Sequence, residues 1–275
     1  MKKVSASKII IYLILIIWAV TTVFPFLWIL NNSFKPSAEV LRSSFLLPQE
    51  FTMENYHTAF DRLNVLNAYK QSFLISGTVT VGVMVLSSMM AFGLSRYRFK
   101  GKKFVHSLIV ASLMFPVFAT IIPVYRMIVS WGLLSKNIAV ILPQIAGNLS
   151  FATIVMLGFV QSISIEMEEA AYMEGANVFR VFGRIIVPLC RPSLATVAIF
   201  SFLWSYNDLF VQKVMMRDNT KYPVCRLLEE ISSQYGTDFG LMAASVTIIV
   251  VPVMIVYILL QKNIIKGLTA GAIKG

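Results

Sequence analysis

A charged segment between two long apolar runs carries residues that indicate a docking chemistry. Residues 166–192 read EMEEAAYMEGANVFRVFGRIIVPLCRP. The carboxylates of Glu166, Glu168 and Glu169 follow Ser164, a residue that can cap a helix, and acidic side chains suit the positive end of a helix. Gly175 would end this helix, because glycine is the usual residue at a helix C-terminus. The pattern predicts a short helix that could fill a groove on a soluble partner.

A second short helix is predicted from Asn177 to Ile186, and Pro188 then marks the entry into the next apolar run. Small residues along the first helix and its turn would let a partner approach closely: Ala170, Ala171 and Gly175. An ordinary amphipathic loop without a partner is the alternative interpretation of this pattern.

The sequence WSYNDLF at 204–210 is a second constellation with chemical meaning. Aromatic faces and amide or carboxylate groups suit sugars, since sugars present both C–H faces and hydroxyls. The candidates for a substrate pathway are Trp204, Tyr206, Asn207, Asp208 and Asn148, with Gln144 as a weaker one. Polar groups inside membrane spans are costly and are often functional. The alternative, which we favour, is a belt of aromatic residues at the membrane surface.

The elements that must position these residues are long apolar runs. The chain has 275 residues, of which 57% are hydrophobic and 13% are charged. The runs cover 9–30, 71–95, 106–128, 137–159, 189–210 and 239–262, each close to the roughly 20 residues that cross a bilayer. Continuous runs predict helices rather than alternating barrel strands. We therefore predict an all-α polytopic membrane protein with about six transmembrane helices in a single domain over residues 1–275.

The orientation follows from the basic residues. Five of them crowd the short segment between the second and third runs: Arg96, Arg98, Lys100, Lys102 and Lys103. Short loops rich in Lys and Arg stay on the cytoplasmic side, so both termini and the 160–191 loop are predicted to be cytoplasmic. This distribution also accounts for the net charge of +11, and no nucleic-acid partner is predicted.

The sequence lacks several common catalytic motifs. The chain contains no HExxH, no G-x-S-x-G and no GxxxxGK[ST]. Cys190 and Cys225 do not have a metal or redox spacing. We predict no catalytic residue, metal site or cofactor on this chain.

The charged loop also resembles the EAA loop of permease subunits from ATP-binding-cassette (ABC) importers. The family pattern is E-A-A, three residues, G, nine residues and I-x-L-P. It is matched by Glu169, Ala170, Ala171, Gly175, Ile185 and Pro188, with Val187 in place of the usual Leu. Further stretches are similar to sugar-importer permeases, namely 25–35, 53–60, 91–103 and 122–143. The tail at 266–275 resembles that of the maltose-system G permease.

The resemblance implies a multi-pass permease in the cell (inner) membrane of a prokaryote, importing a carbohydrate. Its implied partners are membrane lipid, a second homologous permease, an ATPase dimer that binds ATP and Mg²⁺, and an extracytoplasmic sugar-binding protein. The 166–188 loop would contact the ATPase, with Lys266–Gly275 as a second contact. One alternative is an ABC permease for glycerol phosphate or peptide. Another is a secondary carrier acting alone, although charged residues are almost absent from the centres of the spans.

Overall fold

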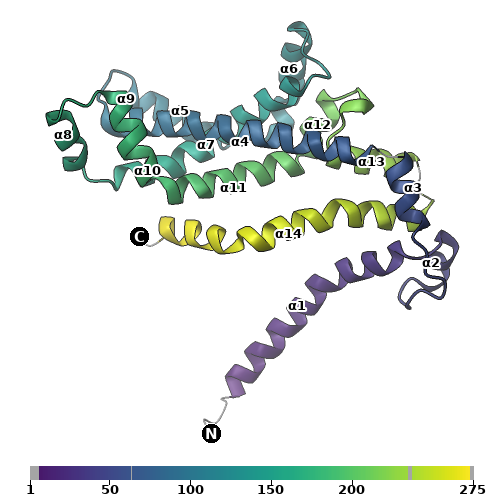
Figure 1. Ribbon diagram of the computed structural model, residues 1–275. Helices are drawn as coiled ribbons and strands as arrows, with labels where there is room; N and C mark the ends of the chain where they lie inside the picture. Colours follow the sequence, from purple (N-terminus) through teal and green to yellow (C-terminus); the bar gives the residue numbers. More distant parts are fainter. Residues whose placement is uncertain (1–5, 63, 235–236, 273–275) are drawn as a thin grey trace. The chain divides into compact units, whose positions relative to one another are not determined.

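A computed structural model describes residues 6–62, 64–234 and 237–272, and its regular structure within these ranges is entirely helical (Figure 1). Three helices are long and apolar enough to cross a membrane singly: α1 (Ala6–Ser33), α4 (Val65–Arg96) and α7 (Asn137–Gln161). Two bent helix pairs raise this number to five if each pair is one span, and α14 (Phe239–Ala272) is apolar over Phe239–Ile255. The predicted all-helical fold with several apolar spans is confirmed, and the count of six spans stays a prediction.

The chain forms two compact units, and the first comprises residues 1–65 and 227–256. It contains α1, α2 (Ser37–Ser43), α3 (Glu54–Arg62) and the first part of α14 (Phe239–Ala272). The buried ammonium of Lys35 donates to the carbonyls of Ser43 (2.8 Å) and Leu46 (2.6 Å), so hydrogen bonds compensate its burial. Gly240 fits close against this turn, since a Cβ there would lie 2.5 Å from the carbonyl oxygen of Lys35.

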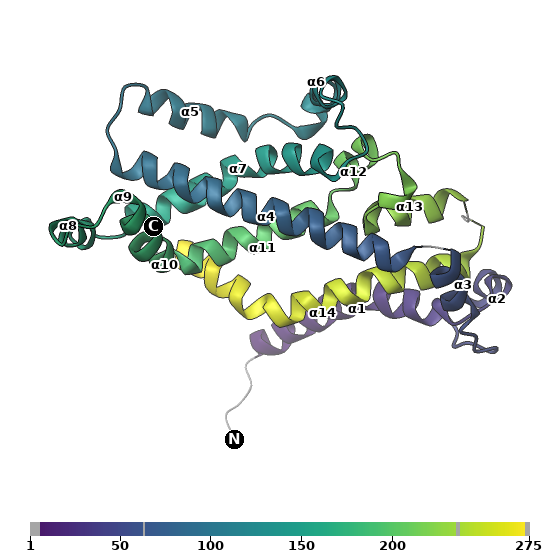
Figure 2. The same ribbon diagram turned by 45° about the horizontal axis from the view of Figure 1, so that its top comes forward.

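The second unit comprises residues 66–226 and the chain from residue 257 onward. Its helices α4, α7 and α11 (Arg191–Asn207) run alongside one another in both views (Figures 1 and 2). Buried apolar side chains recur every four residues on α4, at Ile75, Val79 and Val83. This period places them on one helix face, which packs into the core of the unit.

Two predicted spans are bent rather than straight. The 106–128 segment forms α5 (Lys102–Ser112) and α6 (Val117–Ser130), which are bent by 106°. Pro116 explains the break, because a proline disfavours helical backbone at the preceding residue. The 189–210 segment begins in α10 (Val187–Leu189) and continues in α11 after a bend of 77° at Cys190. It is followed by α12 (Leu209–Met215), a 3-10 turn η2 (Asn219–Lys221) and α13 (Val224–Gln234).

The single transmembrane domain over residues 1–275 stays a prediction. The C-terminal segment Lys266–Gly275, which the resemblance names as a second contact, lies outside the residues whose side chains the structure describes.

Candidate functional site

The charged loop of the second unit is a helix–turn–helix. Its first helix, α8 (Glu166–Met173), begins where the Ser164 hydroxyl accepts a hydrogen bond from the Glu166 amide (3.3 Å). Gly175 has a φ of +81°, a conformation that favours glycine. The Gly175 and Ala176 amides donate to the carbonyls of Tyr172 and Ala171, each at 3.0 Å. These two hydrogen bonds form the pattern of a Schellman motif, and the predicted glycine turn is confirmed.

The second arm of the loop returns to the membrane-spanning helices. It consists of α9 (Val178–Val181), a π-helical turn η1 (Phe182–Ile186) and α10. The Asn177 side chain caps α9 by accepting from the Arg180 amide (2.9 Å). Pro188 has no amide hydrogen to give to the carbonyl four residues earlier, and the π turn directly precedes it.

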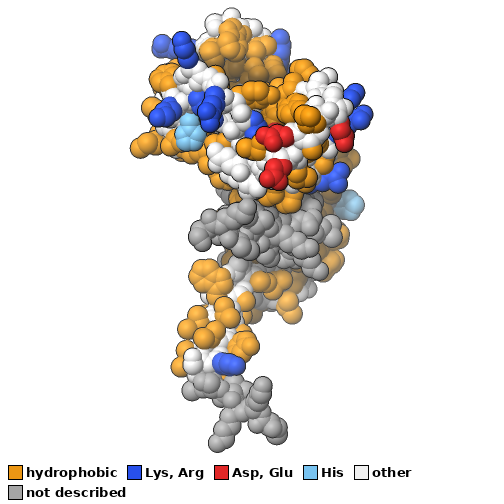
Figure 3. Space-filling view, turned by 90° about the vertical axis from the view of Figure 1, so that its left-hand side faces the viewer, with side chains coloured by type: hydrophobic (Ala, Val, Ile, Leu, Met, Phe, Trp, Pro, Cys, Tyr) orange, Lys and Arg blue, Asp and Glu red, His pale blue; other side chains and the backbone are white. Residues whose placement is uncertain are grey.

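The predicted coupling residues lie on different sides of this loop. Glu169, Ala170 and Gly175 are exposed, whereas the others are half-buried: Ala171, Ile185 and Pro188. Large apolar side chains are exposed beside them, with Met173 at 89% and Phe179 at 79%. Seen from this end of the unit, hydrophobic and acidic side chains lie close together on the surface (Figure 3). Such a surface suits contact with another protein.

Sequence reasoning missed the acidic residue that faces inward, which is Glu168. Its side chain is 5% exposed and accepts from Arg96 at the end of α4, with 2.5 Å between Nε and Oε1. Arg96 also donates through Nη2 to the Ile163 carbonyl (2.9 Å), just before α8. A helical period places Glu168 and Ala171 on one face of α8, but it does not show which face is buried. Nearby, desolvation raises the pKa of the Tyr172 phenol, and contact with Tyr97 and Glu168 adds to this effect.

A cavity of about 720 Å³ is the second candidate site in this unit. It lies between α6, α7 and the junction of α11 with α12, and apolar residues such as Phe118 and Phe210 form much of its wall. Polar residues that the sequence singled out also line it: Gln144, Asn148, Trp204 and Asp208. The volume is in the usual range for small-molecule pockets.

A hydrogen-bonded network holds the polar wall in place. Gln144 Nε2 donates to Asp208 Oδ2 (3.0 Å), while Gln144 Oε1 accepts from the Ser205 hydroxyl (2.6 Å). The other carboxylate oxygen of Asp208 accepts from the Val211 amide (3.0 Å) and caps α12. Each carboxylate oxygen has two lone pairs, so Asp208 can still accept from a hydroxyl in the cavity.

The WSYNDLF residues do not all face this cavity. Trp204 is 46% exposed and its ring lies 5.0 Å from that of Phe151, whereas Tyr206 is buried against Phe73 and Phe202. Asn207 is exposed and donates to the Leu203 carbonyl of its own helix (2.8 Å). The structure thus brings Trp204 and Asp208 to the wall of one cavity. It directs Tyr206 and Asn207 elsewhere.

Within the described ranges 6–62, 64–234 and 237–272, no group of three or more His, Cys, Asp or Glu side chains could hold a metal ion.

Long apolar helices, a cavity with a polar network in its mainly apolar wall, and an exposed helical loop together define a multi-pass transport subunit. The chain belongs to the family of binding-protein-dependent transport system inner membrane components, whose model matches residues 83–270.

Relatives of this chain include permease proteins whose names describe the uptake of sugars. The chain is 32% identical to the diacetylchitobiose uptake system permease protein NgcG of Streptomyces coelicolor, over 95% of this chain and 87% of that protein. It is 31% identical to the galactooligosaccharides transport system permease protein GanQ of Bacillus subtilis, over 96% and 94%. A crystal structure of a bacterial ABC transporter involved in the import of the acidic polysaccharide alginate contains a similar chain. The match has a TM-score of 0.81 at 25% identity and covers 95% of this chain and 99% of that one.

Proposed function

We propose that this chain is the permease subunit of an ABC importer that takes up an uncharged sugar or oligosaccharide. The observation that carries the proposal is the cavity wall that combines the Trp204 ring with Gln144, Asn148 and Asp208. The named substrates of NgcG and GanQ, a chitobiose derivative and galactooligosaccharides, support the same solute class.

The cavity wall suits a passing sugar. The Trp204 ring offers a flat apolar surface for the C–H face of a sugar ring. The Asp208 carboxylate can accept hydrogen bonds from its hydroxyls, and the Gln144 side chain keeps that carboxylate oriented.

The charge of the cavity wall distinguishes a neutral sugar from glycerol phosphate as the solute. Among the described residues that line the cavity, Asp208 is the one with an ionisable side chain, and that side chain is acidic. A glycerol phosphate would meet a like charge without a Lys or Arg in the wall to compensate it. A neutral sugar meets no such repulsion.

The proposed assembly contains a second homologous permease, an ATPase dimer that binds ATP and Mg²⁺, and an extracytoplasmic sugar-binding protein. Both termini and the 166–188 loop would face the cytoplasm, where exposed Met173 and Phe179 would pack into a groove of the ATPase. Glu169 would pair with a basic group of the ATPase, and Gly175 would permit the close approach. ATP-driven closure of the ATPase dimer would then tilt the permeases between inward and outward access.

Uptake by the reconstituted complex tests this function. Proteoliposomes with the ATPase inside and the binding protein outside are supplied with labelled oligosaccharides, glycerol phosphate or peptides. Oligosaccharide uptake that requires ATP is the expected result. Uptake of the phosphate or peptide instead would overturn the solute class, and uptake by the chain alone without ATP would establish a secondary carrier.

Two variants test the cavity wall. Asp208→Asn and Trp204→Ala should each lower uptake roughly tenfold or more, which is the effect of losing a hydrogen bond to a charged group or an equivalent contact. Asn207→Ala is the matched control, because that exposed residue lies on the same helix and bonds within it. Equal uptake by all three variants would remove the cavity from the pathway.

A further inference from the structure

We infer that Arg96 is a positioning residue that attaches the loop to α4. We further infer that α4 transmits a displacement of the loop to its other end, where Asn67, Gln71 and Ser72 bond to a group of polar contacts that we call the polar rim. This inference rests on the proposed function, because the loop is moved by the ATPase only if it docks there. Arg96 touches neither solute nor nucleotide in this scheme and acts through Glu168.

The attachment at the loop end involves both arms of the loop. Arg96 holds α8 through the ion pair with Glu168 and holds the preceding segment through the Ile163 carbonyl. One turn earlier on the same face of α4, the Phe92 ring packs 5.4 Å from that of Phe182 in η1. The C-terminal end of α4 therefore contacts the arm before the Gly175 turn and the arm after it.

Burial makes the ion pair a firm connection. The Arg96 and Glu168 side chains are 10% and 5% exposed. Separating them in place would leave the Glu168 carboxylate with little water and without its ion-pair partner, which is costly. A displacement of α8 is therefore accommodated at lower cost if Arg96 and the end of α4 move with it.

The body of α4 can carry such a displacement. It is one helix of 32 residues, about 48 Å long at 1.5 Å per residue. It contains no proline, whereas α1, α7 and α14 each contain one. Proline is the usual cause of a sharp kink, so α4 lacks the commonest point of bending.

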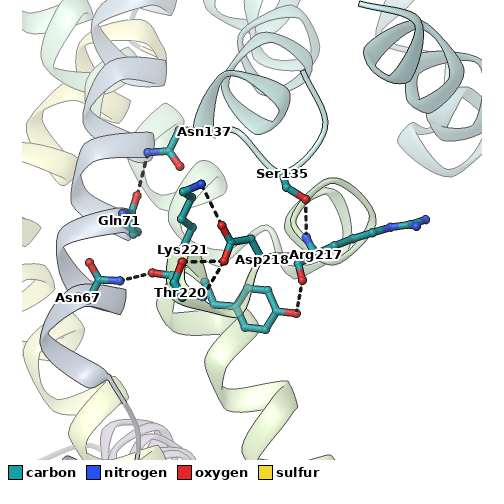
Figure 4. Close-up of polar contacts among 9 residues, drawn as sticks. Asn67, Gln71, Ser135, Asn137, Arg217, Asp218, Thr220 and Lys221 are labelled. Atoms are coloured by element: carbon teal, nitrogen blue, oxygen red, sulfur yellow. Dashed lines mark hydrogen bonds and ion pairs between the residues drawn. The ribbon is translucent and has the colours of Figure 1, made fainter. Parts of the chain in front are cut away.

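The other end of α4 is bonded to a polar rim (Figure 4). Asn67 donates to the Thr220 carbonyl (2.5 Å), and Gln71 accepts from the side chain of Asn137 at the start of α7 (2.8 Å). The Ser72 hydroxyl accepts from the buried Val224 amide at the start of α13 (2.8 Å).

The rim is also held together internally. Asp218 accepts from the Thr220 hydroxyl (2.6 Å) and pairs with Lys221 (2.9 Å). The segment between α12 and α13 is thus a compact turn, and α4 contacts it on one side. A displacement of α4 along its axis would reach this turn and the entrance to α13.

Cys225 is a native reporter of the rim. It follows Val224, is half-buried, and its thiol contacts the Tyr206 carbonyl (3.2 Å). Cys190 is fully buried, so a membrane-impermeant maleimide should report on Cys225. The experiment measures the labelling rate of Cys225 in the full complex in nanodiscs, with and without ATP, for the parent chain and for variants of the ion pair.

In the parent complex, ATP should change the labelling rate roughly fivefold or more, within the range of conformational couplings. Arg96→Gln and Glu168→Gln should each keep the ATPase bound and hydrolysing ATP but abolish this change. The exchanged pair Arg96→Glu with Glu168→Arg should recover part of it. Arg98→Gln, an exposed neighbour on the same segment, is the matched control and should behave like the parent.

Two results would overturn the inference. One is an unchanged ATP response in Arg96→Gln, which would show that the rim is driven by another route. The other is loss of the ATPase from both single variants without recovery in the exchanged pair, which would make the ion pair a folding element only. Failure of the parent chain to recover any ATPase is a separate outcome and refutes the proposed function instead.

Discussion

Replacement of Gly175 tests whether the geometry of the loop turn is needed to couple ATP hydrolysis to transport. The structure allows the free-energy cost of the replacement to be estimated. Gly175 has a φ of +81°, and a Cβ added there would have nothing within 4 Å. A substitution therefore meets no steric obstacle from its neighbours within the described chain, and its cost is that of the backbone conformation. For an L-residue other than Asn or Asp this cost is about 1–2 kcal/mol.

The expected order of coupling follows from this cost. Gly175→Asn should be close to the parent, Gly175→Ala should be impaired, and Gly175→Val should be worse, because a β-branched residue is least tolerated at positive φ. Since each 1.4 kcal/mol is a factor of ten in an equilibrium, Gly175→Ala should reduce the population of the native turn by roughly five- to thirtyfold relative to its alternatives.

The assay is the ratio of sugar transported to ATP hydrolysed, measured with the amount of ATPase recovered on the purified permease. Gly183→Ala is the matched control, because Gly183 is exposed in the same loop, has a negative φ and also has open space at its Cβ. Equal effects at positions 175 and 183, or an Asn variant worse than the Ala variant, would refute the argument from the left-handed turn.

Three further predictions concern packing and titration. Gly82→Val should lower the thermal unfolding temperature of the purified protein, because a Cβ at 82 would lie 2.6 Å from Ile145 Cδ1, whereas Gly77→Ala, with open space, should not. Burial raises the pKa of the Cys225 thiol to about 11, so maleimide labelling should still increase with pH between 8 and 10, where an exposed thiol approaches its plateau. Thr220 and Lys221 lower the pKa of Asp218 to about 2; its contribution to stability is present above the unfolded-state pKa and is lost as the pH falls toward 2. The rate at which maleimide labels Cys225 in the parent, divided by the rate in Asp218→Asn, should therefore stay constant between pH 5 and 8.

The local features of the loop could be predicted from the sequence because they depend on neighbouring residues. Gly175 ends α8 because the left-handed conformation is available to glycine, and Ser164 lies where its hydroxyl reaches the first turn. Pro116 likewise accounts for the break between α5 and α6. The break was not predicted because residues 106–128 form one apolar run. A run of apolar residues specifies insertion into lipid but not straightness.

The helical membrane class was also determined by sequence alone. In lipid the backbone finds hydrogen-bond partners only in a helix or a closed barrel, and continuous apolar runs of roughly 20 residues, without the alternation of barrel strands, indicate helices. The family pattern at 169–188 follows from residue types and spacing in the same way, without any tertiary information.

Only the tertiary structure decided which polar residues act together. The helical period places Trp204 and Asp208 on one face and Tyr206 on another, but it does not say that the first face borders a cavity shared with Gln144. It also does not say that Glu168, rather than Glu169, is the buried member of the acidic turn. Its partner Arg96 is 72 residues away in sequence, and the two meet because α4 and α7 lie side by side. A short-range pattern specifies the conformation of each element, whereas the contacts between elements depend on packing over the whole unit, which no local spacing encodes.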